Sequence, residues 1–93
     1  MLSDGARPRL APGVRTQHDG ARGAWVVQAP ERLVYPDEAA MAVLARCDGR
    51  RTVEEIVAEV AQEHGESPTA LEDDIHELLE ELMAHGVLTD GGP

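Results

Sequence analysis

The chain has 93 residues, with 18 acidic side chains against 8 basic ones and a formal net charge of −10 at pH 7. This length provides for one domain with a small core, and the negative charge disfavours binding to nucleic-acid phosphates and to anionic membranes. No apolar run approaches the roughly 18 residues of a membrane span, no secretory signal is evident, and the single cysteine, Cys47, cannot form an internal disulfide. We therefore expect a cytoplasmic protein whose partners are cationic or neutral.

The chain is predicted to form one domain between two short tails. Residues 1–9 mix Gly, Pro and Arg with small side chains, a composition that predicts a flexible N-terminal tail. The domain is expected to span residues 10–90, and residues 91–93 are expected to be frayed.

Two short strands and a tight turn are predicted first. Residues 14–17 alternate between apolar and polar side chains, and residues 24–28 form the return strand after a turn that contains Asp-Gly and a second glycine. We expect Trp25 to be buried beside Val27, where it would anchor the sheet to the elements beneath it.

A third strand is predicted over residues 32–35, between Pro30 and Pro36. The chain becomes helical after this strand, which leaves it without an obvious outer partner. Such an edge can receive another strand. It can also pair with a second copy at high concentration, whereas a monomer is expected in dilute solution.

Three helices are predicted in the second half of the chain. Asp37 offers an N-cap for the first, whose apolar residues recur at helical spacing up to Cys47. Thr52 and Glu55 form a capping box for the second, and the third begins at Ser67-Pro68 or at Thr69. The third helix has the strongest apolar stripe, made of Leu71, Ile75, Leu78, Leu79, Leu82 and Met83.

His-Gly pairs end the second and third helices, and residues 87–89 are a short apolar tail that can pack back as a strand. The predicted fold class is therefore α+β, with three short N-terminal antiparallel strands, three helices and a trailing strand. This succession resembles a winged helix-turn-helix.

Three segments in this order and spacing resemble the PqqD family. They are Trp-Val-Val-Gln-Ala-Pro-Glu-Arg at 25–32, Cys-Asp-Gly-Arg-Arg-Thr-Val-Glu-Glu-Ile-Val at 47–57, and Leu-Leu-Glu-Glu-Leu-Met-Ala-His-Gly-Val-Leu at 78–88. The resemblance implies a peptide chaperone of pyrroloquinoline quinone biosynthesis, that is, a recognition element for a ribosomally made precursor peptide. Such a protein binds the peptide PqqA and presents it to the radical-SAM enzyme PqqE, and it needs no cofactor.

The resemblance also implies a site. In this class of proteins the leader peptide adds as a strand to the third strand and lies against the third helix. Carried over to this sequence, the peptide-binding residues would be Arg32, Leu33, Val34, Tyr35, Leu71, Asp74, Ile75 and Leu78. Pro36 departs from the family pattern, in which the strand is expected to continue with an apolar residue at this position. Because proline has no N–H to offer a visiting strand, the added strand should be confined to residues 32–35.

Each of these features also fits a purely structural role. Leucines at helical spacing usually pack inward, so Leu71, Ile75 and Leu78 fit the core as well as a ligand contact. The edge strand fits an ordinary edge protected by its flanking prolines. The third helix also carries an acidic flank formed by Asp74, Glu77 and Glu81. That flank is either a solvated face or a surface that meets Lys or Arg on a partner.

A winged-helix architecture also suggests DNA binding, but the helix that would read the duplex is acidic where basic side chains are required. A regulatory interaction domain with an unrelated partner is a further alternative. No metal site is expected, because the histidines show no ligand spacing; they are His18, His64, His76 and His85. Cys47 should be a buried, inert thiol, and the absence of catalytic motifs predicts that the chain is not an enzyme.

Overall fold

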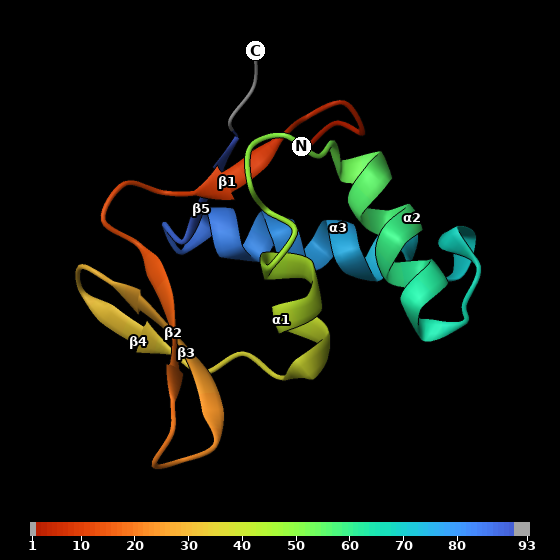
Figure 1. Ribbon diagram of the computed structural model, residues 1–93. Helices are drawn as coiled ribbons and strands as arrows, with labels where there is room; N and C mark the ends of the chain where they lie inside the picture. The colour runs from red at the N-terminus through yellow and green to blue at the C-terminus, as the bar shows by residue number, and fades with distance from the viewer. Residues whose placement is uncertain (1, 91–93) are drawn as a thin grey trace.

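The computed structural model describes residues 2–90, and its elements follow the predicted order, preceded by one short strand that was not predicted (Figure 1). The strands are β1 Pro8–Leu10, β2 Arg15–Asp19, β3 Ala24–Ala29, β4 Arg32–Val34 and β5 Leu88–Asp90, and the helices are α1 Glu38–Leu44, α2 Val53–His64 and α3 Pro68–Ala84. The predicted α+β class is confirmed. Residues 91–93, expected to be frayed, lie outside the described residues. Over residues 2–90, no helix has the length and apolar character needed to cross a membrane.

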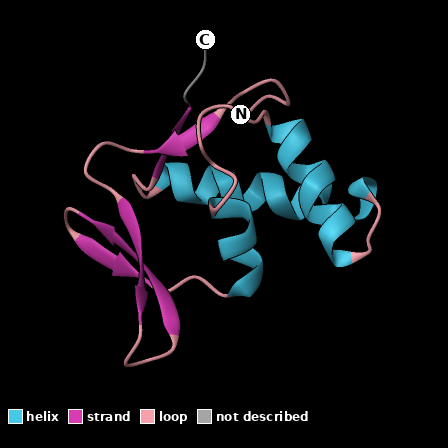
Figure 2. Cartoon of the chain, viewed as in Figure 1, coloured by secondary structure: helices cyan, strands magenta, loops and turns pink. Residues whose placement is uncertain are grey.

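The strands form two antiparallel sheets (Figure 2). One has the order β2-β3-β4, and the other pairs β1 with β5. In the first sheet Val27 lies opposite Val34, and Gln28 lies opposite Leu33. Because side chains alternate between the faces of a strand, Val27 and Val34 share the face that packs on the core. Leu33 therefore stands on the opposite face, with 58% of its surface exposed.

Residues 2–9 do not form the flexible tail that their composition predicted. Leu2 and Ala6 are buried in the core, and β1 follows them. The first turn of an α-helix leaves backbone N–H groups without helical acceptors. In α2, the N–H groups of Val53 and Glu54 donate to the carbonyl oxygens of Ala6 and Asp4, at 2.9 and 3.1 Å. These bonds join segments that are far apart in the sequence, so local composition could not indicate them.

The three helices begin at caps that the sequence indicated. Asp37 Oδ1 accepts a hydrogen bond from the backbone N–H of Ala40 at 2.8 Å, and Thr52 forms the predicted reciprocal capping box at the start of α2. Ser67, rather than Thr69, caps α3: its Oγ accepts from the N–H of Ala70 at 3.2 Å. The choice agrees with Pro68 at the first helical position, where a missing N–H costs nothing.

Cys47 is buried, as expected, although α1 ends one turn earlier than predicted, at Leu44. Its thiol donates to the carbonyl oxygen of Val43 at 3.3 Å. Burial, with a smaller contribution from the nearby charge of Asp48, raises the pKa of the Cys47 thiol to about 12. The thiolate, which is the nucleophilic form, is therefore scarce at neutral pH.

Trp25 is not buried, so the prediction that it anchors the sheet is wrong. It is 44% exposed, and its ring meets the ring of His18 on the paired strand edge-on, with centroids 5.2 Å apart. Val27 shares its strand face and is fully buried. The difference arises because the β2–β3 hairpin extends beyond the helices, so only the end of the sheet nearest them is covered (Figure 1).

Asp48 organises the turn between α1 and α2. Its Oδ1 accepts the backbone N–H groups of Arg50 and Arg51 at 2.8 and 3.0 Å, and its Oδ2 forms an ion pair with the guanidinium of Arg51 at 2.6 Å. Arg51 in turn contacts Glu59 on α2 at 3.0 Å. The backbone hydrogen bonds from Arg51 and Arg50 hold the pKa of the Asp48 carboxyl below its ordinary value of 3.8.

We predict that Asp48→Asn makes the stability of the fold less sensitive to acid. A carboxyl with a lowered pKa stabilises the folded state above its unfolded pKa of 3.8, and this contribution is lost as the pH falls through the folded pKa. Urea unfolding measured at several pH values below about 5 should therefore show a shallower loss in the variant than in the wild type. Asp73→Asn, on the exposed surface of α3, is the control and should keep the wild-type slope. Identical slopes for Asp48→Asn and the wild type would contradict the assignment.

Candidate functional site

A groove of about 860 Å³ lies between β4, the start of α1 and the C-terminal half of α3. Most of its lining is apolar and comes from Leu33, Val34, Tyr35, Pro36, Ala39, Ala40, Leu78, Leu82 and Val87. Its polar lining is Glu31, Arg32, Asp37, Glu81 and His85. The groove thus combines an apolar surface with a mainly acidic set of charged groups.

The edge of β4 borders this groove. β4 is the terminal strand of its sheet, and among the described residues it pairs only with β3. Its outer edge therefore offers backbone N–H and C=O groups to a visiting strand. The ladder covers Arg32 to Val34 and ends one residue before Tyr35, which the sequence had included in the strand. With Pro36 next along the chain, the receiving edge is short.

Five of the eight side chains predicted for the site line this groove: Arg32, Leu33, Val34, Tyr35 and Leu78. The other three do not. Leu71, Asp74 and Ile75 lie nearer the start of α3 and line a second cavity of about 290 Å³, to which all three helices contribute residues. Ala39 and Leu78 line both cavities, so the two are neighbours along the same face of α3.

The sequence-based prediction missed the part of α3 that lies nearest the groove. Glu81, Leu82 and His85 follow Leu78 by three, four and seven positions, which places all four on one side of the helix. The pattern was present in the sequence. What the sequence lacked was the direction of α3 relative to β4, which decides whether the first or the second half of the helix borders the strand.

The apolar stripe of α3 serves both the core and the cavities. Ile75, Leu79 and Leu82 are buried, which confirms the core interpretation for Ile75. Leu71 and Leu78 are half-buried and pack against the edge of the core. Leu82 does both, because it belongs to the core and also lines the groove.

The charges of the chain are divided unevenly between its two halves. All eight basic side chains are arginines within the first 51 residues, and 12 of the 18 acidic side chains follow them. α3 alone carries six carboxylates and no Lys or Arg. The acidic surface of α3 argues against DNA binding, which requires a basic patch. It also gives the α3 side of the groove a negative potential.

The lining of the groove can be compared with the residue types that act as nucleophiles. Its described lining contains no serine, threonine, cysteine or lysine that could act as a nucleophile. Cys47 is not among the lining residues and is buried elsewhere. The Asp37 carboxylate is engaged as the N-cap of α1, where its Oδ1 accepts the N–H of Ala40.

The sequence of residues 24–88 matches the model of a protein family described as Coenzyme PQQ synthesis protein D (PqqD). The chain belongs to the PqqD family. A protein from Xanthomonas euvesicatoria pv. vesicatoria (strain 85-10), named PqqA binding protein, is 43% identical over 77 residues, which cover 83% of this chain and 84% of that protein. A protein of the same name from Bradyrhizobium diazoefficiens is 34% identical over 89 residues, covering 96% of this chain and 86% of the relative.

Two solved structures share the fold. The solution NMR structure of the PqqD truncation of Methylobacterium extorquens PqqCD, described as a functional and stand-alone recognition element for ribosomally synthesised and post-translationally modified peptides, superposes with a TM-score of 0.80. It is 38% identical to this chain, with coverage of 96% of this chain and 95% of the other. The crystal structure of PqqD from Xanthomonas campestris gives a TM-score of 0.56 at 38% identity, covering 91% and 94% of the two chains.

Proposed function

We propose that this protein binds the precursor peptide PqqA in the groove between β4 and α3, and that the peptide adds as a strand to the free edge of β4. The observation that carries the proposal is the coincidence of an unpaired strand edge with an apolar groove, in a family whose relatives are named PqqA binding protein. Strand addition gives affinity through the main chain, and pockets for alternate side chains give selectivity.

The apolar groove should supply more of the affinity than the strand edge. A ladder of three residues allows about three backbone hydrogen bonds, each with a net value of about 0.5–1.5 kcal/mol. Burial of one leucine-sized side chain contributes about 1.5–3 kcal/mol. Two such side chains of the peptide, placed against Leu78 and Leu82, therefore match or exceed the whole ladder.

The three predicted residues outside the main groove have a different role in this proposal. Leu71, Asp74 and Ile75 line the second cavity, which adjoins the groove at Ala39 and Leu78. We assign them to a contact with peptide residues beyond the added strand. An extended chain that leaves β4 along α3 toward the start of the helix reaches this cavity next.

The charges of the groove favour a peptide with a basic side chain close to the added strand. Glu31, Asp37 and Glu81 contribute three carboxylates, against one guanidinium from Arg32. A lysine or arginine of the peptide placed beside Glu81 gains from the negative potential of α3, and the gain decreases with added salt.

The biological role in the proposal is that of an adaptor in the cytoplasm. The chain holds PqqA and presents it to the radical-SAM enzyme PqqE during pyrroloquinoline quinone biosynthesis, while it performs no chemistry itself. A domain of this size, with a buried Cys47 thiol and no serine, threonine, cysteine or lysine in the described lining of its groove, is suited to positioning a substrate for another protein. The protein is a monomer in dilute solution, and only at high concentration does a second copy compete with the peptide for β4.

The substitution Leu33→Asp should weaken PqqA binding at least about tenfold, because it places a charge in the apolar groove. Isothermal titration calorimetry with the synthetic peptide measures the change. Leu33 is 58% exposed, so circular dichroism should remain that of the wild type. Trp25→Asp is the matched control, since Trp25 is also an exposed apolar residue of this sheet but does not line the groove. A folded Leu33→Asp protein with wild-type affinity would refute strand addition at β4.

Reversal of one charge in the groove should also weaken binding of the peptide. Glu81→Lys is expected to lower the affinity for a peptide with a basic residue about three- to tenfold at low salt, with a smaller effect at high salt. Glu77→Lys makes the same change on an exposed position of α3 that lines neither cavity, and it should have little effect. Equal losses in both variants would indicate a general field effect and not a contact in the groove.

Presentation to PqqE can be separated from peptide binding. Size-exclusion chromatography of this protein, PqqA and PqqE together should give a ternary complex. Leu33→Asp should remove the peptide from the complex and leave the two proteins associated, because the peptide groove is then the only surface altered. If the wild-type protein and peptide elute apart from PqqE at concentrations at which they bind each other, the adaptor role is wrong and the peptide-binding role stands.

A further inference from the structure

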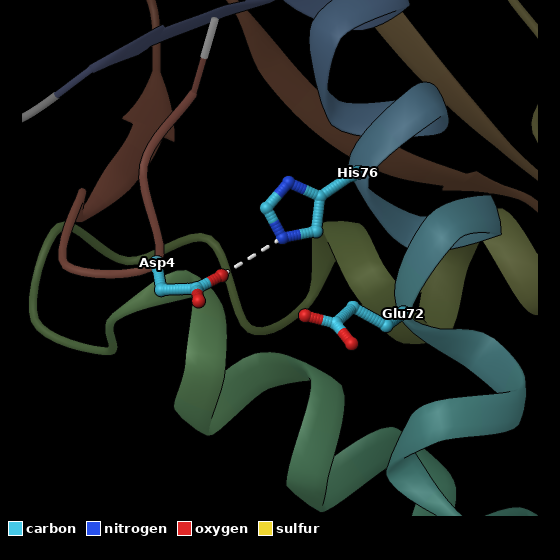
Figure 3. A group of neighbouring side chains, drawn as sticks. All are labelled: Asp4, Glu72 and His76. Carbon is cyan, nitrogen blue, oxygen red and sulfur yellow. Dashed lines mark hydrogen bonds and ion pairs between the residues drawn. The ribbon is translucent and has the colours of Figure 1, made fainter.

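A cluster of potential metal ligands joins the N-terminal segment to α3, on residues that do not line the groove (Figure 3). Asp4, Glu72 and His76 each offer one ligand atom, and these atoms all lie within 4.8 Å of one another. His76 Nε2 is 3.0 Å from Asp4 Oδ1. Glu72 and His76 are one helical turn apart, and Figure 3 shows their side chains on the side of α3 that faces Asp4. The sequence spacing of the histidines gave no sign of this cluster.

The backbone holds Asp4 in position. The Asp4 carbonyl oxygen accepts the N–H of Glu54 at 3.1 Å, and the Ala6 carbonyl oxygen accepts the N–H of Val53 at 2.9 Å. Leu2, which precedes Asp4 in the sequence, is buried in the core. The three ligands therefore come from two segments that the fold has already fixed, so a bound ion would not have to order a loose tail.

The donor set selects a class of ion. Two carboxylate oxygens and one imidazole nitrogen are ligands that Zn²⁺ accepts, with water completing the tetrahedral shell. Ca²⁺ and Mg²⁺ prefer oxygen ligands alone, so the imidazole favours a divalent transition metal. Ligands at about 2.1 Å from one ion are at most about 4.2 Å apart, so a spacing of up to 4.8 Å requires only a small rotation of exposed side chains. Asp4 and Glu72 are both exposed.

The local charge also favours a cation. Glu54 joins Asp4 and Glu72 in lining a cavity of about 270 Å³ beside the cluster. Among the described residues, no basic side chain lines this cavity, so its charged lining consists of these three carboxylates. The field of a chain with a net charge of −10 raises the local concentration of cations further.

We propose that Asp4, Glu72 and His76 bind a divalent transition-metal ion, with Zn²⁺ as the representative, and that the ion adds a further link between the N-terminal segment and α3. Binding at this site stabilises the folded chain, because the ligands are brought together only by folding. The site is independent of the peptide groove, since none of its residues lines that groove.

The test is a titration of the full chain with ZnCl₂, with MgCl₂ as the comparison, followed by calorimetry and amide NMR shifts. Zn²⁺ is expected to bind with one-to-one stoichiometry, to shift amides near residues 3–6 and 72–76, and to raise the melting temperature, whereas Mg²⁺ at the same concentration should produce none of these three effects. His76→Gln should lower the Zn²⁺ affinity at least about tenfold. His85→Gln, which alters a histidine outside the cluster, should retain it.

Glu72→Gln separates a metal site from a simple hydrogen bond between Asp4 and His76. Glu72 is exposed, so its amide variant should fold like the wild type without metal. It should nevertheless lose at least about tenfold in Zn²⁺ affinity and keep its affinity for the peptide. The proposal is overturned if the wild type shows no saturable Zn²⁺ binding, if Glu72→Gln binds Zn²⁺ as the wild type does, or if the shifts map to His64 or His85.

Discussion

The pairing of Val27 with Val34 holds the candidate groove in place. Val27 is fully buried, and Val34 packs beside it against the same core, so the edge of β4 is fixed relative to α3. A slip of one residue in this register would bring Leu33 toward the core and turn Val34 outward, because side chains alternate along a strand. The core and the groove therefore depend on the same register between β3 and β4, and substitutions that loosen β4 would disrupt both.

α3 connects this groove to the N-terminal part of the chain. Its second half borders the groove with Leu78 and Leu82, and its first half carries Glu72 and His76 opposite Asp4. The N-terminal segment in turn supplies acceptors for the first N–H groups of α2, which the helix cannot satisfy itself. The groove and the metal-ligand cluster thus occupy different halves of one helix, so residues of either can be substituted without removing the other.

Local chemistry made much of the fold predictable. Caps such as Thr52 with Glu55, and the apolar stripe of α3, are encoded within a few residues and appear as predicted. The two largest failures depend on contacts between distant segments. Trp25 is exposed because the helices do not reach the end of its hairpin, and the residues around Asp4 are ordered by α2. The same reason explains why the site was predicted only in part. The sequence located β4, but which half of α3 borders β4 depends on the direction of the helix relative to that strand.

The β1–β5 ladder has a practical consequence for linking this domain to other molecules. Pro8 lies directly opposite Asp90, and Leu2, the first described residue, lines the same cavity as Asp90, the last one. The two ends of the described chain therefore lie close together, and none of these residues lines the groove. A second domain or a solid support attached at either end would leave the groove accessible. If an enzyme were tethered there, transfer of a bound peptide to it would become intramolecular, and the length of the linker would set the effective concentration of the enzyme at the groove.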